Sequence, residues 1–345
     1  MELNFLDIKD DITIVDSFAK ADSVINNPRY KSILCSVSGG SDSDIMLDLI
    51  YRVDLSKKVK YIWFNTGIEY QATKDHLDYL EEKYGIEIIR ERAIKPIPST
   101  CREYGQPFLS KFVSEQIDRL QKHNFRWEDK TIEDLLKEYP NCKGALRWFC
   151  NDYGYYNGRL SSFNIDNFKY LREFLIANPP NFKISAKCCA YAKKNVAKQL
   201  IKEYNADLNI VGVRRAEGGI RTIAYKNCIT ISNDKVDNYR PIFWYKTENK
   251  QNYENKFNIK HSECYTKYGF KRTGCCCCPY GRNLEEELKI TSIYEPMIYR
   301  AVCNIFKESY EYTRMYKEYV HFMKLKGDKT QIKGQRNIFD YIKNP

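Results

Sequence analysis

Six consecutive residues, Ser38-Gly39-Gly40-Ser41-Asp42-Ser43, combine glycines, hydroxyls and a carboxylate in a pattern suited to binding phosphate. They follow residues 32–37, a short apolar run rich in β-forming residues, which predicts a buried strand. Apolar residues at helical spacing come next, between Ile45 and Ile50. A strand that enters a glycine turn and then a helix presents free backbone N–H groups at the positive end of that helix. The sequence therefore predicts an anion site here. An ordinary strand-to-helix turn capped by Ser or Asp is the alternative.

Cysteines are the second group of residues with chemical potential, and the chain contains 13 of them. Two are adjacent, Cys188 and Cys189, and four form the later run Gly274-Cys275-Cys276-Cys277-Cys278-Pro279. Cys275 and Cys278 have the C-x-x-C spacing that allows two thiolates to reach one metal centre. In a reducing compartment, so many cysteines favour metal or redox chemistry over a disulfide framework.

Arginines follow a further apolar run, residues 207–213, which predicts another buried strand. Arg214, Arg215 and Arg221 come directly after it, together with Glu217. Guanidinium groups at the C-terminal end of a strand suit the oxygens of phosphate or sulfate. Solvent-exposed arginines without a ligand are the alternative.

The elements that must position these residues alternate between strand and helix. A strand is predicted at 61–65, a helix from Gln71 to Tyr84 that ends at Gly85, and a third strand at 86–89. This alternation predicts an α/β fold with a Rossmann-like parallel sheet covered by helices on both faces. Ligands bind beyond the C-terminal strand ends of such sheets, which is where residues 38–43 and 65–69 fall.

The expected organisation of the chain has three parts. Residues 1–95 and 181–245 form the α/β domain, residues 96–180 form a helical insertion, and residues 246–345 form a C-terminal region with the cysteine cluster and basic helices. Within the insertion, helices are predicted at 109–121, 131–139 and 165–177. Its many basic and aromatic residues suit the docking of a larger substrate, and a helical lid or a buried helical layer is the alternative.

Composition limits the class of protein. The 345 residues contain no stretch near the roughly 18 uninterrupted apolar residues that a membrane helix requires. The first residues, MELNFLDIKDD, are acidic and lack the layout of a signal peptide, so a cytoplasmic protein without a membrane partner is expected. The net charge of +11 favours polyanionic partners, nucleic acid among them.

The Ser-Gly-Gly-x-Asp-Ser string resembles the pyrophosphate-binding loop of the PP-loop ATP pyrophosphatases, also called adenine nucleotide α-hydrolases. The chain is similar to the phosphoadenylyl-sulfate (PAPS) reductase-like branch of that superfamily. The resemblance implies a bound adenine nucleotide, ATP with Mg²⁺, and a role for Asp42 in capping the helix or coordinating the metal. The residues that it implies at the nucleotide are Ser36, Ser38, Gly39, Gly40, Ser41, Asp42, Ser43, Asn65, Thr66, Gly67 and Arg214.

Two other segments carry the same resemblance. Asn65-Thr66-Gly67 resembles the Asp-Thr-Gly that follows the second strand in these reductases, with an amide in place of the carboxylate. The Gly-x-Arg-x-x-Glu-x-x-x-Arg pattern from Gly212 to Arg221 resembles the stretch that faces the nucleotide there. By this resemblance Asp42, Arg214 and Arg221 are catalytic residues, and the two arginines neutralise developing negative charge.

The two cysteine pairs resemble the Cys-Cys … Cys-x-x-Cys pattern that holds a 4Fe-4S cluster in adenylyl-sulfate reductases. The resemblance implies that the metal ligands are Cys188, Cys189, Cys275 and Cys278. Zinc is the runner-up, because four-cysteine zinc sites are common. Cys276 and Cys277 either compete as ligands or serve as nearby thiols.

These features favour an ATP-dependent sulfur-transfer or thiolation enzyme that forms AMP and pyrophosphate, like the DNA phosphorothioation proteins and tRNA thiolases that the chain resembles. The expected partners are a sulfur-donor protein or sulfide, a DNA or tRNA acceptor, and a second copy of the chain. A reductase of adenylyl sulfate or PAPS is the runner-up. The chain lacks the Glu-Cys-Gly-Leu-His stretch that carries the nucleophile of those reductases, and only Cys303 remains after Cys278. A non-catalytic sensor of nucleotide and cluster is the second alternative.

Overall fold

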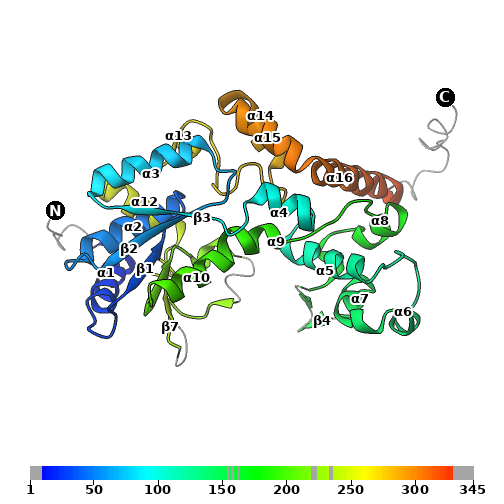
Figure 1. The fold of residues 1–345 in the computed structure, drawn as a ribbon, viewed down its shortest axis with the longest axis horizontal. Coiled ribbons are helices and arrows are strands. Elements are labelled where there is room, and N and C mark those ends of the chain that lie inside the picture. The colour runs from blue at the N-terminus through cyan, green and yellow to red at the C-terminus, as the bar shows by residue number, and fades with distance from the viewer. Residues whose placement is uncertain are drawn as a thin grey trace. The chain divides into compact units, whose positions relative to one another are not determined.

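A computed structural model describes residues 10–153, 155–156, 159–161, 163–218, 224–232 and 236–328. The chain divides into two compact units (Figure 1). The first unit comes from residues 1–100 and 187–304, and the second from residues 101–186 and 305–345. The stretch 246–345, expected as one C-terminal region, is divided between both units. None of the helices among the described residues is long and apolar enough to cross a membrane.

The first unit is built on a six-stranded sheet with the strand order β3-β2-β1-β6-β8-β7. Neighbouring strands are parallel from β3 to β8, and β7 is antiparallel to β8 at the edge. The mainly parallel sheet confirms the Rossmann-like α/β fold predicted from the sequence. Its strands are β1 (Ile33–Ser36), β2 (Val59–Asn65), β3 (Ile88–Arg92), β6 (Leu208–Val211), β7 (Ile229–Thr230) and β8 (Asp237–Tyr239).

Helices cover both faces of this sheet (Figure 1). Ile33 and Cys35 of β1 pack into a core with four helices, whereas Leu34 between them packs with Val196 and Leu200 of α10 (Asn195–Glu203) on the opposite face. Side chains of successive strand residues point to opposite faces, so one apolar strand serves both layers. The four helices of the first face are α1 (Ile12–Ile25), α2 (Ser41–Val53), α3 (Gln71–Tyr84) and α12 (Thr247–Lys256).

The position of β1 in the sheet determines where a ligand can bind. The chain leaves β1 through α2 to β2 on one side, and its other neighbour is β6, which follows α10. Connections that diverge from two adjacent parallel strands leave a crevice at the C-terminal strand ends. The strand order therefore predicts a ligand site beyond Ser36 and Val211, where the glycine loop and Arg214 follow.

The remaining helices of the first unit follow α12 or precede α10. α9 (Lys187–Cys189) leads through a π-helical turn, Ala190–Lys194, into α10. After α12 come α13 (Glu263–Thr266), α14 (Leu284–Tyr294) and α15 (Pro296–Ile305), whose last residue belongs to the second unit.

The second unit has its own aromatic core, in which Phe108 and Phe174 pack against Tyr312 and Tyr316. Its elements are α4 (Ile97–Tyr104), which begins in the first unit, α5 (Lys111–Lys122), α6 (Ile132–Glu138), α7 (Lys143–Phe149), the hairpin of β4 (Tyr155–Tyr156) and β5 (Arg159–Leu160), α8 (Leu171–Ala177) and α16 (Lys307–Asp328). Short 3₁₀ turns occur at Pro140–Cys142 and Ile165–Asn167 here, and at Arg215–Glu217 in the first unit.

The sequence predicted the ends of one helix correctly and missed a break in another. α3 begins and ends at the predicted residues, because Gly85 adopts a left-handed φ of 59° that stops the helix. The helix predicted over 165–177 is wrong as a single element. Tyr170 has a φ of 58°, which separates the 3₁₀ turn Ile165–Asn167 from α8.

Candidate functional site

The glycine loop joins the end of β1 to the start of α2. Gly39 has a φ of 67°, and a Cβ at this position would lie 2.8 Å from Cγ2 of Thr73, so only glycine fits without strain. The Ser38 N–H donates to Oγ of Ser43 over 2.9 Å and closes the loop onto the first turn of α2. Ser36, the last residue of β1, is half-buried. The loop backbone thus lies at the positive end of α2, where an anion is stabilised.

Asp42 lies in the first turn of α2 between two cations. Its carboxylate is 2.8 Å from Nε of Arg214 and 2.9 Å from Nζ of Lys250. Burial opposes ionisation of Asp42, but the hydrogen bonds and charges of Arg214 and Lys250 outweigh burial and lower its pKa. Asp42 does not cap the helix, because α2 already begins at Ser41 and its cap residue is Gly40, which has no side chain to donate or accept.

A second carboxylate of the first turn, the buried side chain of Asp44, joins α2 to two histidines. One oxygen of Asp44 is 3.0 Å from Nε2 of His76 in α3, and the other is 2.7 Å from Nδ1 of His261. Nε2 of His261 lies 2.9 Å from Glu254 of α12. Burial disfavours the charged imidazole, but Asp44 and Glu254 together raise the pKa of His261 to about 9. His261 is therefore protonated at neutral pH and holds both carboxylates.

Residues from α12 to the cysteine run reach the glycine loop. Nζ of Lys250 hydrogen-bonds Oγ of Ser41, and the Ser41 N–H donates to the hydroxyl of Tyr265 over 3.1 Å. The Tyr265 hydroxyl is 3.3 Å from Oγ1 of Thr273. Because Thr273 precedes Cys275 by two residues, the cysteine run starts beside the loop.

The turn after β2 is organised by the buried carboxylate of Glu69. It accepts the Thr66 N–H over 3.0 Å, the Thr66 hydroxyl, and the Gly67 N–H over 3.1 Å. Asn65 also accepts the Gly67 N–H, over 3.1 Å. The Thr66 hydroxyl lies 3.6 Å from Sγ of Cys275, so this turn adjoins the cysteine run as well as the crevice.

The outer cysteines of the run share their surroundings with Cys189. Cys275 forms an antiparallel bridge with Glu69, which fixes the start of the run against the turn after β2. Burial raises the pKa of Cys278 to about 12, and the charges of Cys275 and Cys189 act in the same direction. The charges of Cys275 and Cys189 thus act on Cys278, and a common metal centre for these thiols stays a prediction.

The two inner cysteines of the run, Cys276 and Cys277, contact other residues than the outer cysteines, Cys275 and Cys278. Cys276 and Cys277 are fully buried, with their sulfurs 3.8 Å apart. Sγ of Cys277 lies 3.3 Å from Oγ1 of Thr291 and 3.9 Å from the hydroxyl of Tyr70. The left-handed φ of Cys277, 43°, turns the chain between the inner and outer positions. The sequence left open whether Cys276 and Cys277 compete with the outer cysteines as metal ligands. In the fold, Cys277 contacts Thr291 and Tyr70.

Lys193 is the cation of this cysteine neighbourhood. It lies one helical turn after Cys189, in the π-helical turn Ala190–Lys194. The charge of Cys275 makes the largest contribution to raising the pKa of Lys193, and burial opposes it. Cys189 and Cys278 contribute further, whereas Cys188 is buried beside Cys189 on α9.

The donor set is suited to a metal centre in type, because thiolates are the ligands of iron–sulfur clusters and of many zinc sites. Burial raises the pKa of the Cys275 thiol, and the Lys193 charge only partly offsets this, so a bound metal would supply the positive charge that stabilises the thiolate. Among the described ranges, no group of three or more His, Cys, Asp or Glu side chains is arranged to hold a metal ion. The residues present fit the group by their chemistry alone, and the ligand set stays a prediction.

Other predicted residues lie at the same edge or outside the described ranges. Arg214 follows β6 and reaches Asp42, as given above. Arg221 falls in the stretch 219–223, which lies outside the described residues.

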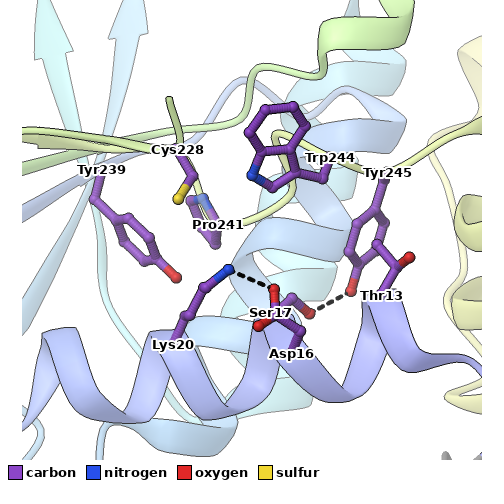
Figure 2. Close-up of a pocket in the computed structure, with 9 residues that line it drawn as sticks. All are labelled: Thr13, Asp16, Ser17, Lys20, Cys228, Tyr239, Pro241, Trp244 and Tyr245. Atoms are coloured by element: carbon purple, nitrogen blue, oxygen red, sulfur yellow. Dashed lines mark hydrogen bonds and ion pairs between the residues drawn. The ribbon is translucent and has the colours of Figure 1, made fainter. Parts of the chain in front are cut away.

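A small pocket elsewhere in the first unit, of about 10 Å³, lies between α1 and the segment after β8 (Figure 2). Figure 2 shows the Ser17 hydroxyl against the Tyr245 hydroxyl, 2.6 Å apart, and Lys20 beside Asp16. Its volume accommodates about one water molecule, so it does not accommodate a nucleotide.

Sequence reasoning missed Lys250, Tyr265, Thr273, His261 and Glu69. Lys250 and Tyr265 are more than 200 positions from the loop that they contact, and no spacing rule connects them. Lys193 did carry a local signal, because it follows Cys189 by four residues in an expected helix.

The glycine loop at a switch point of a parallel sheet defines a nucleotide-binding α/β protein of the PP-loop class. Residues 32–124 and 167–281, more than half of the chain, match the phosphoadenosine phosphosulfate reductase domain. The chain belongs to this family, as its motifs predicted, and the family's members are enzymes that act on nucleotides.

Individual relatives are distant. An uncharacterized protein of Methanocaldococcus jannaschii is 34% identical over 106 residues, which are 31% of this chain and 22% of that protein. PAPS reductase from Candida auris, in a phosphate complex, has 12% identity and a TM-score of 0.40, with coverage of 80% of this chain and 97% of that one. The U34-tRNA thiolase NcsA from Methanococcus maripaludis, with its 4Fe-4S cluster, has 13% identity and a TM-score of 0.37, with coverage of 88% and 79%.

Proposed function

We propose that this chain is an ATP-dependent sulfur-transfer or thiolation enzyme that uses a 4Fe-4S cluster and releases AMP and pyrophosphate. The observation that carries the proposal is the adjacency of two sites at one sheet edge. The Ser41 amide of the glycine loop bonds Tyr265, Tyr265 contacts Thr273, and Cys275 follows two residues later. A nucleotide at the loop and sulfur chemistry at the cysteines would thus meet within one unit.

The loop residues would bind the phosphates. Backbone N–H groups at the start of α2 donate to phosphate oxygens, and the hydroxyls of Ser38 and Ser41 add donors. Arg214 stabilises the negative charge that develops as pyrophosphate leaves, and Arg221 is proposed for the same role. Asp42, which already binds two cations, is the carboxylate available for Mg²⁺.

The reaction needs two displacements. An oxygen of the acceptor forms a bond to the α-phosphorus of ATP, the bond to the bridging oxygen breaks, and pyrophosphate leaves with the electron pair. A sulfur nucleophile then replaces that oxygen on the acceptor, and AMP leaves with it. The charged groups around the loop would stabilise both departures.

Cys188, Cys189, Cys275 and Cys278 would hold the cluster, and zinc remains the second candidate for the same ligands. When bound, the cluster would supply redox-active iron beside the nucleotide site. Because each of its four irons would carry one of these thiolates, the transferred sulfur would come from outside the cluster. Lys193 would offset the negative charge of the thiolates, since the charge of Cys275 already raises its pKa. The turn of Glu69 and Thr66 positions Cys275.

Proposed partners follow from the charge and chemistry. A net charge of +11 suits a DNA or tRNA acceptor, and the sulfur would come from sulfide or a donor protein. We also propose a cytoplasmic location, consistent with the number of free cysteines, and association of two copies.

A sulfonucleotide reductase is the second candidate, and the family match favours it. That reaction requires a nucleophilic cysteine to attack the sulfate sulfur. The sequence after Cys278 offers only Cys303, which lies half-buried in α15. A non-catalytic sensor of nucleotide and cluster would bind both and turn over neither.

The deciding experiment titrates ATP with Mg²⁺, adenylyl sulfate and PAPS against anaerobically purified protein by calorimetry. Preference for ATP, followed by pyrophosphate release with a thiolatable acceptor, is the expected result. Tighter binding of either sulfonucleotide would overturn the proposal in favour of the reductase. ATP binding without pyrophosphate release under any acceptor and sulfide condition would favour the sensor.

A further inference from the structure

Lys250 is a charged residue at the glycine loop that belongs to no recognised motif of the chain. It lies on α12, near the middle of the helix, and its side chain is only 16% exposed. Burying the head of a lysine among apolar atoms is unfavourable, so such a position implies specific partners. Its partners are the hydroxyl of Ser41, the carboxylate of Asp42 and, at 3.6 Å, the carboxylate of Glu254.

Two of these partners belong to the first turn of α2. Ser41 is the first residue of the helix, and its N–H is among those that an anion at the helix start would bind. An amine hydrogen-bonded to the Ser41 hydroxyl lies within a few Å of such an anion. The Ser41 N–H currently donates to a neutral oxygen, the Tyr265 hydroxyl, at 3.1 Å, which marks the place where an oxygen acceptor fits.

The surroundings fix Lys250 in this position. Glu254, four residues later on α12, faces Lys250 and accepts from His261, which is itself anchored to buried Asp44. Asp42 holds Lys250 on one oxygen and Arg214 on the other. The amine and the guanidinium are therefore preorganised on both sides of the carboxylate, and binding a phosphate requires little ordering of either.

We propose that Lys250 is a phosphate-binding residue of this site, which contacts the β- or γ-phosphate of a nucleoside triphosphate. The proposal rests on the proposed ATP-dependent function. By this proposal α12 is the third segment that contributes to the phosphate site, after the glycine loop and the segment with Arg214 that follows β6. A hydrogen bond from an ammonium group to a phosphate oxygen is stronger than one between neutral groups.

The test compares Lys250→Met with Lys256→Met, the same substitution at an exposed lysine of the same helix. The affinities of both variants and of the wild type are measured for ATP, inorganic pyrophosphate and adenosine. Lys250→Met is expected to weaken ATP and pyrophosphate about 10- to 100-fold, the range for one charge-assisted hydrogen bond, and to leave adenosine unchanged. Lys250→Arg is expected to retain most of the affinity, and Lys256→Met all of it.

The outcomes separate the two proposals. Wild-type affinity for ATP in Lys250→Met would overturn the assignment of Lys250 and leave the ATP-dependent function standing. Equal weakening of adenosine and ATP would also overturn it, because a damaged fold does not discriminate between ligands with and without phosphate. No ATP binding by the wild type would overturn the proposed function and this assignment with it.

Discussion

Single residues in and directly after the glycine loop have structural requirements that few other residue types meet. Gly39 must satisfy both a left-handed backbone and a 2.8 Å approach to Thr73. Asp42 and Asp44 are adjacent acidic positions in the first turn of α2 but serve different groups, cations at the loop and imidazoles in the interior. The side chains of the first turn therefore connect the ligand site to the core of the first unit.

Gly39→Ala is expected to lower the free energy of unfolding by about 1–3 kcal/mol, the cost of strained backbone at a non-glycine residue, and to abolish ATP binding. Gly85→Ala is the matched control, because Gly85 has a similar φ of 59° and nothing within 4 Å of an added Cβ. Urea unfolding and nucleotide titration measure both effects. Full ATP affinity in Gly39→Ala would contradict the role of the loop.

Deprotonation of His261 is expected to lower the free energy of unfolding at alkaline pH. Its pKa is about 9 in the folded protein against 6.5 ordinarily, so its contribution is complete below pH 6.5 and is lost as the pH rises through 9. The size of this contribution is up to about 3 kcal/mol, from the free-energy equivalent of a pKa shift. Urea unfolding between pH 6 and 10 should show the loss in the wild type, and His261→Gln should flatten it. Exposed His123→Gln is the control, and an unchanged slope in His261→Gln would refute the assignment.

Short elements rather than long ones surround the cysteines of the 275–278 run. The turn 275–278, the turn after β2 and the π-helical turn Ala190–Lys194 surround the same thiols. Two of these turns are fixed by their own contacts. Glu69 holds the turn after β2, and Tyr70 and Thr291 hold the inner cysteines of the turn 275–278.

Substitutions within this turn should separate ligands from structural thiols. Cys275→Ser and Cys278→Ser are expected to lose most of the iron after anaerobic reconstitution, because each removes a thiolate ligand. Cys276→Ser and Cys277→Ser are expected to retain it and to lower the free energy of unfolding by about 1–3 kcal/mol, since a hydroxyl replaces a buried thiol. Iron content and visible absorbance measure the first effect, and urea unfolding the second. Equal iron loss in all four variants would contradict the division into inner and outer cysteines.

The whole molecule consists of two units with separate cores. The first unit contains the glycine loop, Arg214, Lys250 and the outer cysteines, whereas the second contains the aromatic cluster of Phe108, Phe174 and Tyr312. A chain with two cores unfolds in more than one step when each core is cooperative by itself.

Thermal unfolding is therefore expected to show two transitions, and ATP should raise the temperature of only one, because a ligand stabilises the unit that binds it. Trp63 and Trp244 report on the first unit, and Trp127 and Trp148 on the second. Fluorescence of a Trp63→Phe/Trp244→Phe variant should follow the transition that ATP leaves unchanged. A single transition that shifts as a whole would contradict independent cores.

The sequence predicted those features that depend on a few contiguous residues. The glycine loop, the strand before it, the helix after it and the end of α3 at Gly85 each follow from local backbone preferences, and all lie where they were expected. The helix over 165–177 failed because its apolar spacing continues across Tyr170 although the backbone there is left-handed. Spacing records which face a residue occupies and not every backbone angle.

By itself, the sequence determined the fold class and the family, and it located the glycine loop and the cysteine run. Only the tertiary structure decided that Lys250 and Tyr265 contact Ser41 and that His261 holds Asp44. It also decided that Cys277 contacts Thr291, whereas Cys275 contacts Thr66. The physical reason is that side-chain contacts between distant segments leave no periodic trace along the chain. They arise when the sheet brings its strand ends together and the later helices fold back over them.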